Sequence, residues 1–321
     1  MSGLITKELT MNMPLRIFLT ITAGALLLMA MAGGVIAAEQ KTFATPAAAV
    51  NALVKAAEDG NQDEMLTILG DEGKELVYSG DSAQDEAGRQ GFVKAYKAKH
   101  ALIEQDSKTR ILQVGLKSWP MPIPIVNDGG KWRFDTAEGK QELLFRRIGH
   151  NELGAIAACR GFIAAQNDYA ASAHDGLPAG LYARKLMSDP GKQNGLYWET
   201  AEGDDPSPAG PLLAEAGVQG ADSTAPGKAQ PYHGYYYRIV TAQGPSAKGG
   251  ARSYLVDGQL SGGVALVAYP AEYRNNGVMT FFINQSGVVY QKDLGEKTND
   301  IAATITEYNP DKSWKKVPGT E

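Results

Sequence analysis

The sequence has little cysteine and little histidine. Its 321 residues include one cysteine, Cys159, and four histidines. A single thiol cannot form an intramolecular disulfide, and no group of Cys and His residues has the spacing of a zinc site. We therefore expect a fold without disulfides, predict no metal ligands, and interpret Cys159 as a small apolar packing residue.

The sequence also lacks the signatures of common catalytic and cofactor-binding classes. It contains no Gly-x-Ser-x-Gly, the turn that exposes the nucleophile of a serine hydrolase. It contains no phosphate-binding loop ending in Lys-Ser/Thr, no Gly-x-Gly-x-x-Gly and no His-Glu-x-x-His. A Cys–His pair is formally available, but Cys159 falls on an apolar helical stripe that disfavours a thiolate. We predict no catalytic residue and no cofactor, and the sequence favours a non-enzymatic protein while leaving enzymatic activity open.

Clustered basic residues are missing as well. The chain has 31 Lys and Arg against 36 Asp and Glu, a formal net charge of −5. Neutralising nucleic-acid phosphates requires grouped cations, so we do not expect nucleic acid as a partner. Adjacent acidic pairs such as Asp204-Asp205 indicate solvated surface, because neighbouring residues of a helix point about 100° apart and do not converge. The loop at 202–205 could collect calcium through carboxylate oxygens, but it lacks the residue spacing of a calcium loop.

The N-terminal segment has the three-part form of a secretory signal. Lys7 and Arg16 supply positive charge, residues 17–38 contain no charged side chain, and small residues at 35–38 suit cleavage. An uncleaved anchor is the alternative, since such a stretch could span a bilayer, and translation could also start at Met13. No cysteine is present there for lipidation. We expect residues 1–38 to be a signal peptide and the protein to be periplasmic or extracellular, meeting the membrane only if the segment is not cleaved.

The mature chain begins with a helical pattern. Apolar residues recur at helical spacing over about 46–59, behind a Thr45-Pro46 start, and a second short helix follows Asn61. Residues 92–103 suggest a third helix, which would include His100 and Ile103. Three helices are thus expected before the first strand.

A two-residue period follows. Residues 111–116 alternate as a strand does, the prolines at 120, 122 and 124 indicate an edge or a surface loop, and Asn-Asp-Gly-Gly at 127–130 turns the chain into a strand at 131–135. Helices followed by a curved antiparallel sheet resemble nuclear-transport-factor-like and cystatin-like α+β folds. This resemblance covers about residues 42–137 and rests on the order of elements.

The second half predicts a long helix, a polar excursion and a sheet. We expect the helix at about 140–172 and a loop with little regular structure at 174–231. Four strands are then expected in an antiparallel meander, the last two joined by a short hairpin loop; they lie at residues 235–241, 264–269, 278–284 and 288–292.

The C-terminal half resembles the heads of type IV pilins and of type II secretion pseudopilins. The similarity is carried by residues 151–156 and 165–170 of the helix and by the hairpin at 277–290. A pilin polymerises through an apolar N-terminal helix, whereas this helix follows a complete domain and carries charged residues. An ordinary pilus subunit is therefore not expected.

The whole mature chain resembles a bacterial family known as domain of unknown function 2950. The segments that carry this resemblance are 132–135, 146–153, Ala165-Gln166 with Tyr169, 232–236 and 290–295. The resemblance implies a shared architecture and an envelope setting, and no reaction.

One polar cluster interrupts the apolar stripe of the long helix: Arg146, Arg147, His150, Asn151 and Glu152. An Arg fork suits a carboxylate, so the cluster could bind a ligand or a partner. The alternative is a satisfied structural network that clamps two domains together.

Tyr235 and Tyr237 are a second candidate binding feature. Alternation in a strand puts both on one face, which could present an aromatic surface to a glycan or a peptide. Core and rim packing is the alternative.

Together these patterns predict an α+β protein with two domains, at residues 39–139 and 140–321. We expect an exported, non-enzymatic binding or assembly module of the cell envelope, with an envelope protein or a glycan as partner. The alternative is a small-molecule-binding protein or enzyme that uses a pocket of the N-terminal cone-shaped domain. Its lining would be His100, Trp119, Trp132 and Asp135.

The leader makes a direct prediction. Protein recovered from the envelope or the medium should begin close to Glu39, because the small residues at 35–38 mark the cleavage point. N-terminal sequencing or intact mass measures this. A chain that still begins at Met1 or Met13 would instead be an uncleaved, membrane-tethered protein.

Overall fold

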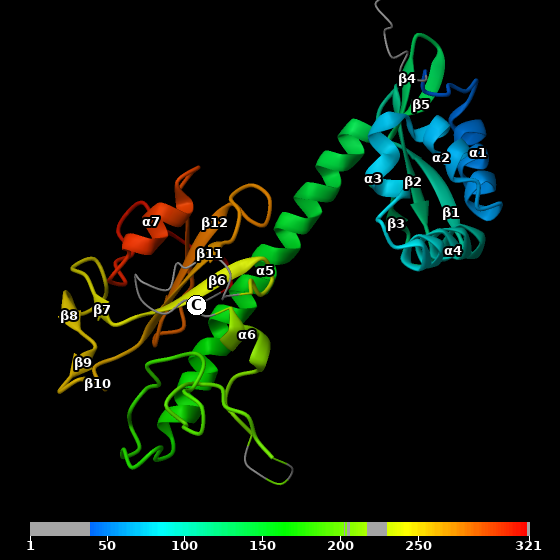
Figure 1. Ribbon diagram of the computed structural model, residues 1–321. Coiled ribbons are helices and arrows are strands. Elements are labelled where there is room, and N and C mark those ends of the chain that lie inside the picture. Colours follow the sequence, from blue (N-terminus) through cyan, green and yellow to red (C-terminus); the bar gives the residue numbers. More distant parts are fainter. Residues whose placement is uncertain (1–38, 202, 204–205, 217–229, 320–321) are drawn as a thin grey trace, which may run out of the picture. The chain divides into compact units, whose positions relative to one another are not determined.

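The computed structural model describes residues 39–201, 203, 206–216 and 230–319. The predicted signal peptide and the pair Asp204-Asp205 lie outside the described residues. Residues 40–321 form one compact unit, apart from residues 1–39. Within that unit, helices and antiparallel sheets surround two hydrophobic cores, one within residues 49–134 and one within 155–317 (Figure 1). The predicted α+β class is confirmed.

The first core is covered by helices. These are α1 (Pro46–Glu58), α2 (Gln62–Leu69), the 3-10 helix η1 (Asp71–Gly73), α3 (Lys74–Val77) and α4 (Ser82–Ala98). Helices α1, α2 and α4 each have a side-chain cap at the N-terminus. Thr45 accepts the Ala48 amide at 3.1 Å ahead of the proline that opens α1, and Asn61 accepts the Glu64 amide at 3.0 Å. Both caps satisfy amides that have no partner inside the helix.

The third predicted helix was wrong at its C-terminal end. Helix α4 stops at Ala98, and His100 and Ile103 lie in the strand β1 (His100–Glu104). His100 is opposite Val114 and Ile103 opposite Ile111 of the neighbouring strand. Pairing in the sheet overrides a helical spacing that continues from Tyr96 to His100 by coincidence.

The first sheet is antiparallel throughout. It contains β1, β2 (Thr109–Val114), β3 (Trp119–Pro120), β4 (Ile125–Asp128) and β5 (Lys131–Phe134), in the order β1-β2-β4-β5, with β3 paired to β2. The predicted hairpin joins β4 and β5 through Gly129 and Gly130, whose φ angles of 60° and 87° favour glycine. Leu112, Ile125 and Phe134 fill the core beneath.

The long helix α5 (Thr136–Ala170) links the elements of both cores. Asp135 caps it, and the Thr136 hydroxyl donates to the Leu69 carbonyl at 2.6 Å. Its second half buries Ala155, Cys159 and Phe162. The helix runs without a break through the predicted domain boundary at 139/140.

The second sheet is the predicted meander with one further strand. Its order is β14-β13-β12-β11-β6, and all neighbours are antiparallel. The strands are β6 (Tyr235–Val240), β11 (Ala265–Pro270), β12 (Met279–Asn284), β13 (Tyr290–Asp293) and β14 (Lys315–Lys316). Strand β6 is therefore one edge of the sheet.

Short elements complete this half. The described part of the long excursion contains the short helix α6 (Pro211–Glu215), in keeping with the predicted scarcity of regular structure. A further helix, α7 (Thr298–Thr304), follows the meander, and the sequence patterns did not predict it. Two-residue strands make small hairpins: β7 (Ala242–Gln243) with β8 (Arg252–Ser253), and β9 (Leu255–Val256) with β10 (Gln259–Leu260).

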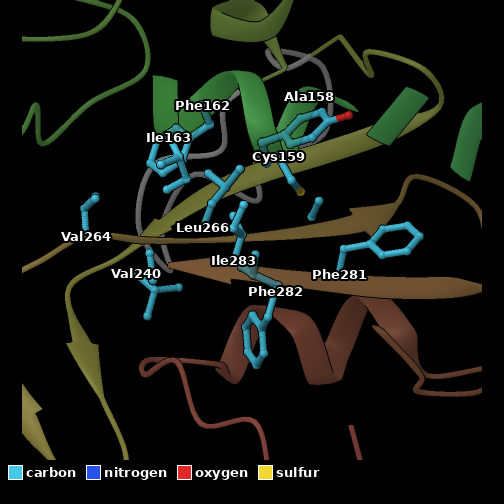
Figure 2. Close-up of a cluster of buried hydrophobic side chains, with 14 of the residues drawn as sticks. Ala158, Cys159, Phe162, Ile163, Val240, Val264, Leu266, Phe281, Phe282 and Ile283 are labelled. Carbon is cyan, nitrogen blue, oxygen red and sulfur yellow. The ribbon is translucent and has the colours of Figure 1, made fainter. Parts of the chain in front are cut away.

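The second sheet is packed on both faces. Figure 2 shows Cys159 and Phe162 of α5 on one side of the strands, with Leu266 and Ile283 reaching towards them. Phe282 points to the opposite side, where the Trp314 ring stacks on it at 4.2 Å. Residues on both faces of β11 and β12 are buried. Their sequences are therefore mainly apolar runs and do not alternate between apolar and polar residues.

Among the residues that the structure describes, no helix combines the length and the apolar composition that crossing a membrane requires.

The position of Cys159 predicts a very unreactive thiol. The side chain is 0% exposed, and burial raises the pKa of the thiol from 9.0 to about 12. At pH 8 this lowers the thiolate fraction about 1,000-fold, because each pKa unit is a factor of ten. Iodoacetamide should therefore alkylate the native protein at least that much more slowly than the chain unfolded in guanidinium. Equal alkylation rates would show that Cys159 is not buried in the core. The Cys159→Ser variant measures the background reaction of iodoacetamide with other side chains.

Candidate functional site

The polar cluster on α5 is spread over separate partners. The Arg146 guanidinium donates to Glu142 Oε1 at 2.7 Å and to the Pro120 carbonyl at 2.9 Å, and it lies over the Trp119 ring at 5.1 Å. Arg146 thus binds elements of the first sheet.

The next residues of the cluster bind the loop before β12. Arg147 donates to the carbonyl and the side-chain oxygen of Asn275. Asn151 Nδ2 donates to the Asn276 carbonyl at 2.9 Å. Glu152 Oε1 accepts the amides of Val278 at 2.9 Å and of Met279 at 3.0 Å. These bonds tie α5 to the start of β12 within the C-terminal half, and of the cluster it is Arg146 that bonds to the N-terminal half.

His150 is exposed and meets a histidine that the sequence analysis did not select. Its ring centroid lies 6.0 Å from that of His233, in an edge-on arrangement. His233 packs so closely on Gly154 that a Cβ there would overlap the ring, and Gly234 adopts a φ of 71° beside Asn151. The His-Gly pair inside the conspicuous segment 232–236 was the available signal for this contact.

Tyr235 and Tyr237 share one face of β6, as predicted, but that face is interior. Both side chains are 0% exposed. The Tyr235 hydroxyl donates to the Met279 carbonyl at 2.9 Å, and the Tyr237 hydroxyl donates to the Tyr232 carbonyl at 3.2 Å. Burial raises the pKa of both phenols well above their ordinary value. The packing interpretation accounts for both tyrosines, and neither presents an aromatic surface.

The four residues considered for a pocket in the N-terminal half have local structural roles. His100 stacks on Tyr96 with ring centroids 3.8 Å apart. Trp119 and Trp132 lie against the guanidinium groups of arginines. Asp135 accepts the Glu138 amide as the cap of α5.

A cavity of about 750 Å³ lies elsewhere, at the edge of the second sheet. Its walls are the C-terminal end of α5 with the segment after it (from Tyr169 to Asn194), residues 238–241 of β6 and its continuation, and the end of α7 at Ala303 and Thr306. The described residues that line it include His174, Arg184, Lys185 and Arg238, and none of them is Asp or Glu.

Comparison with known proteins gives a family and no function. The model of a family described as protein of unknown function (DUF2950) matches residues 40–317. The chain belongs to this family. No curated protein and no solved structure matches it. These comparisons do not confirm the resemblances to pilin heads and to nuclear-transport-factor-like folds.

The cations that line the cavity of this DUF2950 chain differ in how far they are already engaged. Lys185 is paired with Asp189, at 2.6 and 2.7 Å to the two carboxylate oxygens. Arg238 donates through Nη2 to the carbonyls of Ala302 and Ile305, both at 2.6 Å, and burial lowers the pKa of its guanidinium. Arg184 is exposed.

Neither Arg184 nor Arg238 forms an ion pair with a carboxylate in the described part of the chain. Partial burial weakens the hydration of the Arg238 charge, so a nearby anion would interact with it more strongly than with a fully exposed arginine. The arrangement can hold an anion, and an Arg fork can do so with two parallel hydrogen bonds.

The imidazole of His174 contacts other residues of the structure. His174 stacks on Tyr169 with ring centroids 4.0 Å apart, and its ring nitrogens lie 2.9 Å from the Tyr169 carbonyl and 3.3 Å from Gln193 Oε1. Among the described residues, no group of three or more His, Cys, Asp or Glu side chains is arranged to bind a metal.

Sequence reasoning missed this cavity because its residues come from separate segments. Arg184 and Lys185 belong to the excursion after α5, which was expected only as surface loop. Arg238 follows the tyrosine run, and its charge inside a strand was the one local signal. Such a charge must find a partner when the strand is packed on both faces.

The bond between Glu152 and the start of β12 can be measured. Glu152→Ala leaves two half-buried amides without an acceptor and should lower the free energy of unfolding by about 1.5–3 kcal/mol. Glu152→Gln keeps an oxygen acceptor and should lower the free energy of unfolding by less than Glu152→Ala does. Chemical denaturation gives these values.

The matched control is Glu142→Ala, ten residues earlier on the same helix. It removes a partly exposed ion pair with Arg146 and should change stability by no more than about 1 kcal/mol. Equal losses for Glu152→Ala and Glu142→Ala would contradict a structural role of the Glu152 carboxylate.

Proposed function

We propose that this protein is an exported, non-enzymatic binding module of the bacterial cell envelope, and that the cavity beside β6 holds an anionic ligand. One observation carries the proposal: Arg184 and Arg238 line a concave site to which the described chain contributes no carboxylate.

The size and the charge of the cavity support binding. A volume of about 750 Å³ lies within the range of roughly 300–1,000 Å³ that small-ligand sites occupy. The protein as a whole carries a formal charge of −5, so the cations of the cavity are opposite in sign to the net charge of the molecule. A local positive site in an acidic protein favours an anion at that place and not over the whole surface.

The chemistry of the same residues supports binding rather than catalysis. The imidazole of His174 is stacked on Tyr169, both of its ring nitrogens lie within hydrogen-bond distance of an oxygen, and the described lining residues offer no carboxylate or thiol to act with it. The proposal of export is supported by the signal-like leader, which has positive charge, an uncharged stretch and small residues in the expected order.

Citrate is a suitable small anionic probe. The purified mature protein should show a rise in Tm with citrate, beyond the rise with sodium chloride at equal ionic strength, because a ligand that binds only the folded state stabilises it. Arg184→Gln should remove most of this difference without changing the Tm of the free protein, since the side chain is exposed.

Arg274→Gln is the matched control, because Arg274 is also exposed but does not line the cavity. It should keep the full response to citrate. Responses of equal size in the wild type, Arg184→Gln and Arg274→Gln would refute anion binding at this cavity.

A further inference from the structure

The cavity lies along an open edge of the second sheet. Strand β6 is the last strand in the order β14-β13-β12-β11-β6, so β11 pairs with only one of its sides. Ile239 and Val240 of this strand are among the residues that line the cavity. The residues that line the cavity therefore include part of an edge strand.

The register shows which main-chain groups of β6 face outward. The Gly234 carbonyl accepts the Ala271 amide on the β11 side, whereas the Tyr237 amide donates to Ala216, away from β11. Main-chain groups alternate between the two sides of a strand with a period of two residues. The N–H and C=O of Ile239 and the N–H of Thr241 therefore point outward with those of Tyr237.

The outward groups of Ile239 have no partner in the part of the chain that the structure describes. The Ala216 carbonyl accepts the Tyr237 amide, and the Tyr254 amide donates to the Thr241 carbonyl. Between these two bonds, no described residue bonds to the N–H or the C=O of Ile239. The edge of β6 between these two bonds, from Tyr237 to Thr241, is roughly 13 Å long at 3.3 Å per residue, and the groups without a described partner lie at its centre, on Ile239.

The surroundings of this stretch select the charge of an occupant. Arg238 points to the α7 side of the strand, where it donates to the Ala302 and Ile305 carbonyls. Arg184 lines the same cavity, and Leu177 and Leu181 add apolar surface. Side chains of an added strand would alternate between the two sides, so acidic and apolar residues would both find partners.

We infer that the cavity takes an extended, acidic peptide segment of a partner protein, which adds as a strand to β6. The inference rests on the proposed function and narrows its ligand. A small anion would use the arginines alone, whereas an acidic peptide uses the arginines and the free main-chain groups of Ile239. Strand addition gives affinity through main-chain hydrogen bonds, and the alternate side chains give specificity.

The test uses labelled peptides and the purified mature protein. The probe is a fluorescein-labelled Val-Glu-Val-Glu-Val peptide, and its binding is measured by fluorescence anisotropy. Two further peptides have the same sequence and charge but carry N-methyl groups, one at the two Glu residues and the other at the central Val. Because only alternate amides face β6, one of these two should bind at least tenfold more weakly than the probe. A Val-Gln-Val-Gln-Val peptide should also bind more weakly.

A protein variant tests the other partner of the same hydrogen bond. Ile239→Pro removes the outward N–H and leaves the pairing with β11, because proline is tolerated at the free side of an edge strand. It should reduce peptide binding at least tenfold while keeping the response to citrate. Retention of that response shows that the variant is folded.

The outcomes separate the two proposals. If both N-methylated peptides bind as well as the probe, strand addition is wrong, while a citrate response that depends on Arg184 would keep the anion site. If neither citrate nor any peptide binds, both proposals fail. Weaker binding of one N-methylated peptide together with loss of binding in Ile239→Pro is the result expected for an added strand.

Discussion

The C-terminal half of this protein depends on the packing of α5 against the middle of the second sheet. Cys159, Phe162 and Ile163 of the helix meet Leu266 and Ile283 of the central strands in one continuous core (Figure 2). This burial excludes water and supplies the main stabilisation of the sheet. It also fixes the direction of α5, so that Glu152 reaches the amides at the start of β12 and Tyr169 reaches the wall of the cavity.

Local patterns were sufficient to predict the elements that repeat a simple period. The first helix with its proline start, the Gly-Gly hairpin, the long helix and the order of the meander all followed from spacing and turn residues. The end of α4 and the whole of α7 did not. Tyr96 and His100 have the spacing of one helical face, and only the pairing of His100 with Val114 decides that the second of them is in a strand.

The candidate site was harder to predict because sequence shows polar residues and not their partners. Arg147, Asn151 and Glu152 stood out on a helix, yet main-chain and amide groups some 125 residues away satisfy them. Arg238 drew no attention, yet its charge has no carboxylate partner in the described chain. Arg238 is also hydrogen-bonded to main-chain carbonyls, so what distinguishes it is its place in the lining of the cavity, and only long-range packing decides that place.

An open sheet edge usually needs protection, because its free N–H and C=O groups can pair with any extended chain. In this protein β14 closes one end of the second sheet with Lys315 and Lys316, both exposed, which discourages pairing there. At the other end, described residues bond to the Tyr237 amide and the Thr241 carbonyl, and none of them bonds to the main chain of Ile239, which lines the cavity with two arginines. The walls restrict access to a narrow segment, and the charge selects its composition. In the proposed strand addition, confinement and charge together would let this edge recognise a particular chain and not any extended chain.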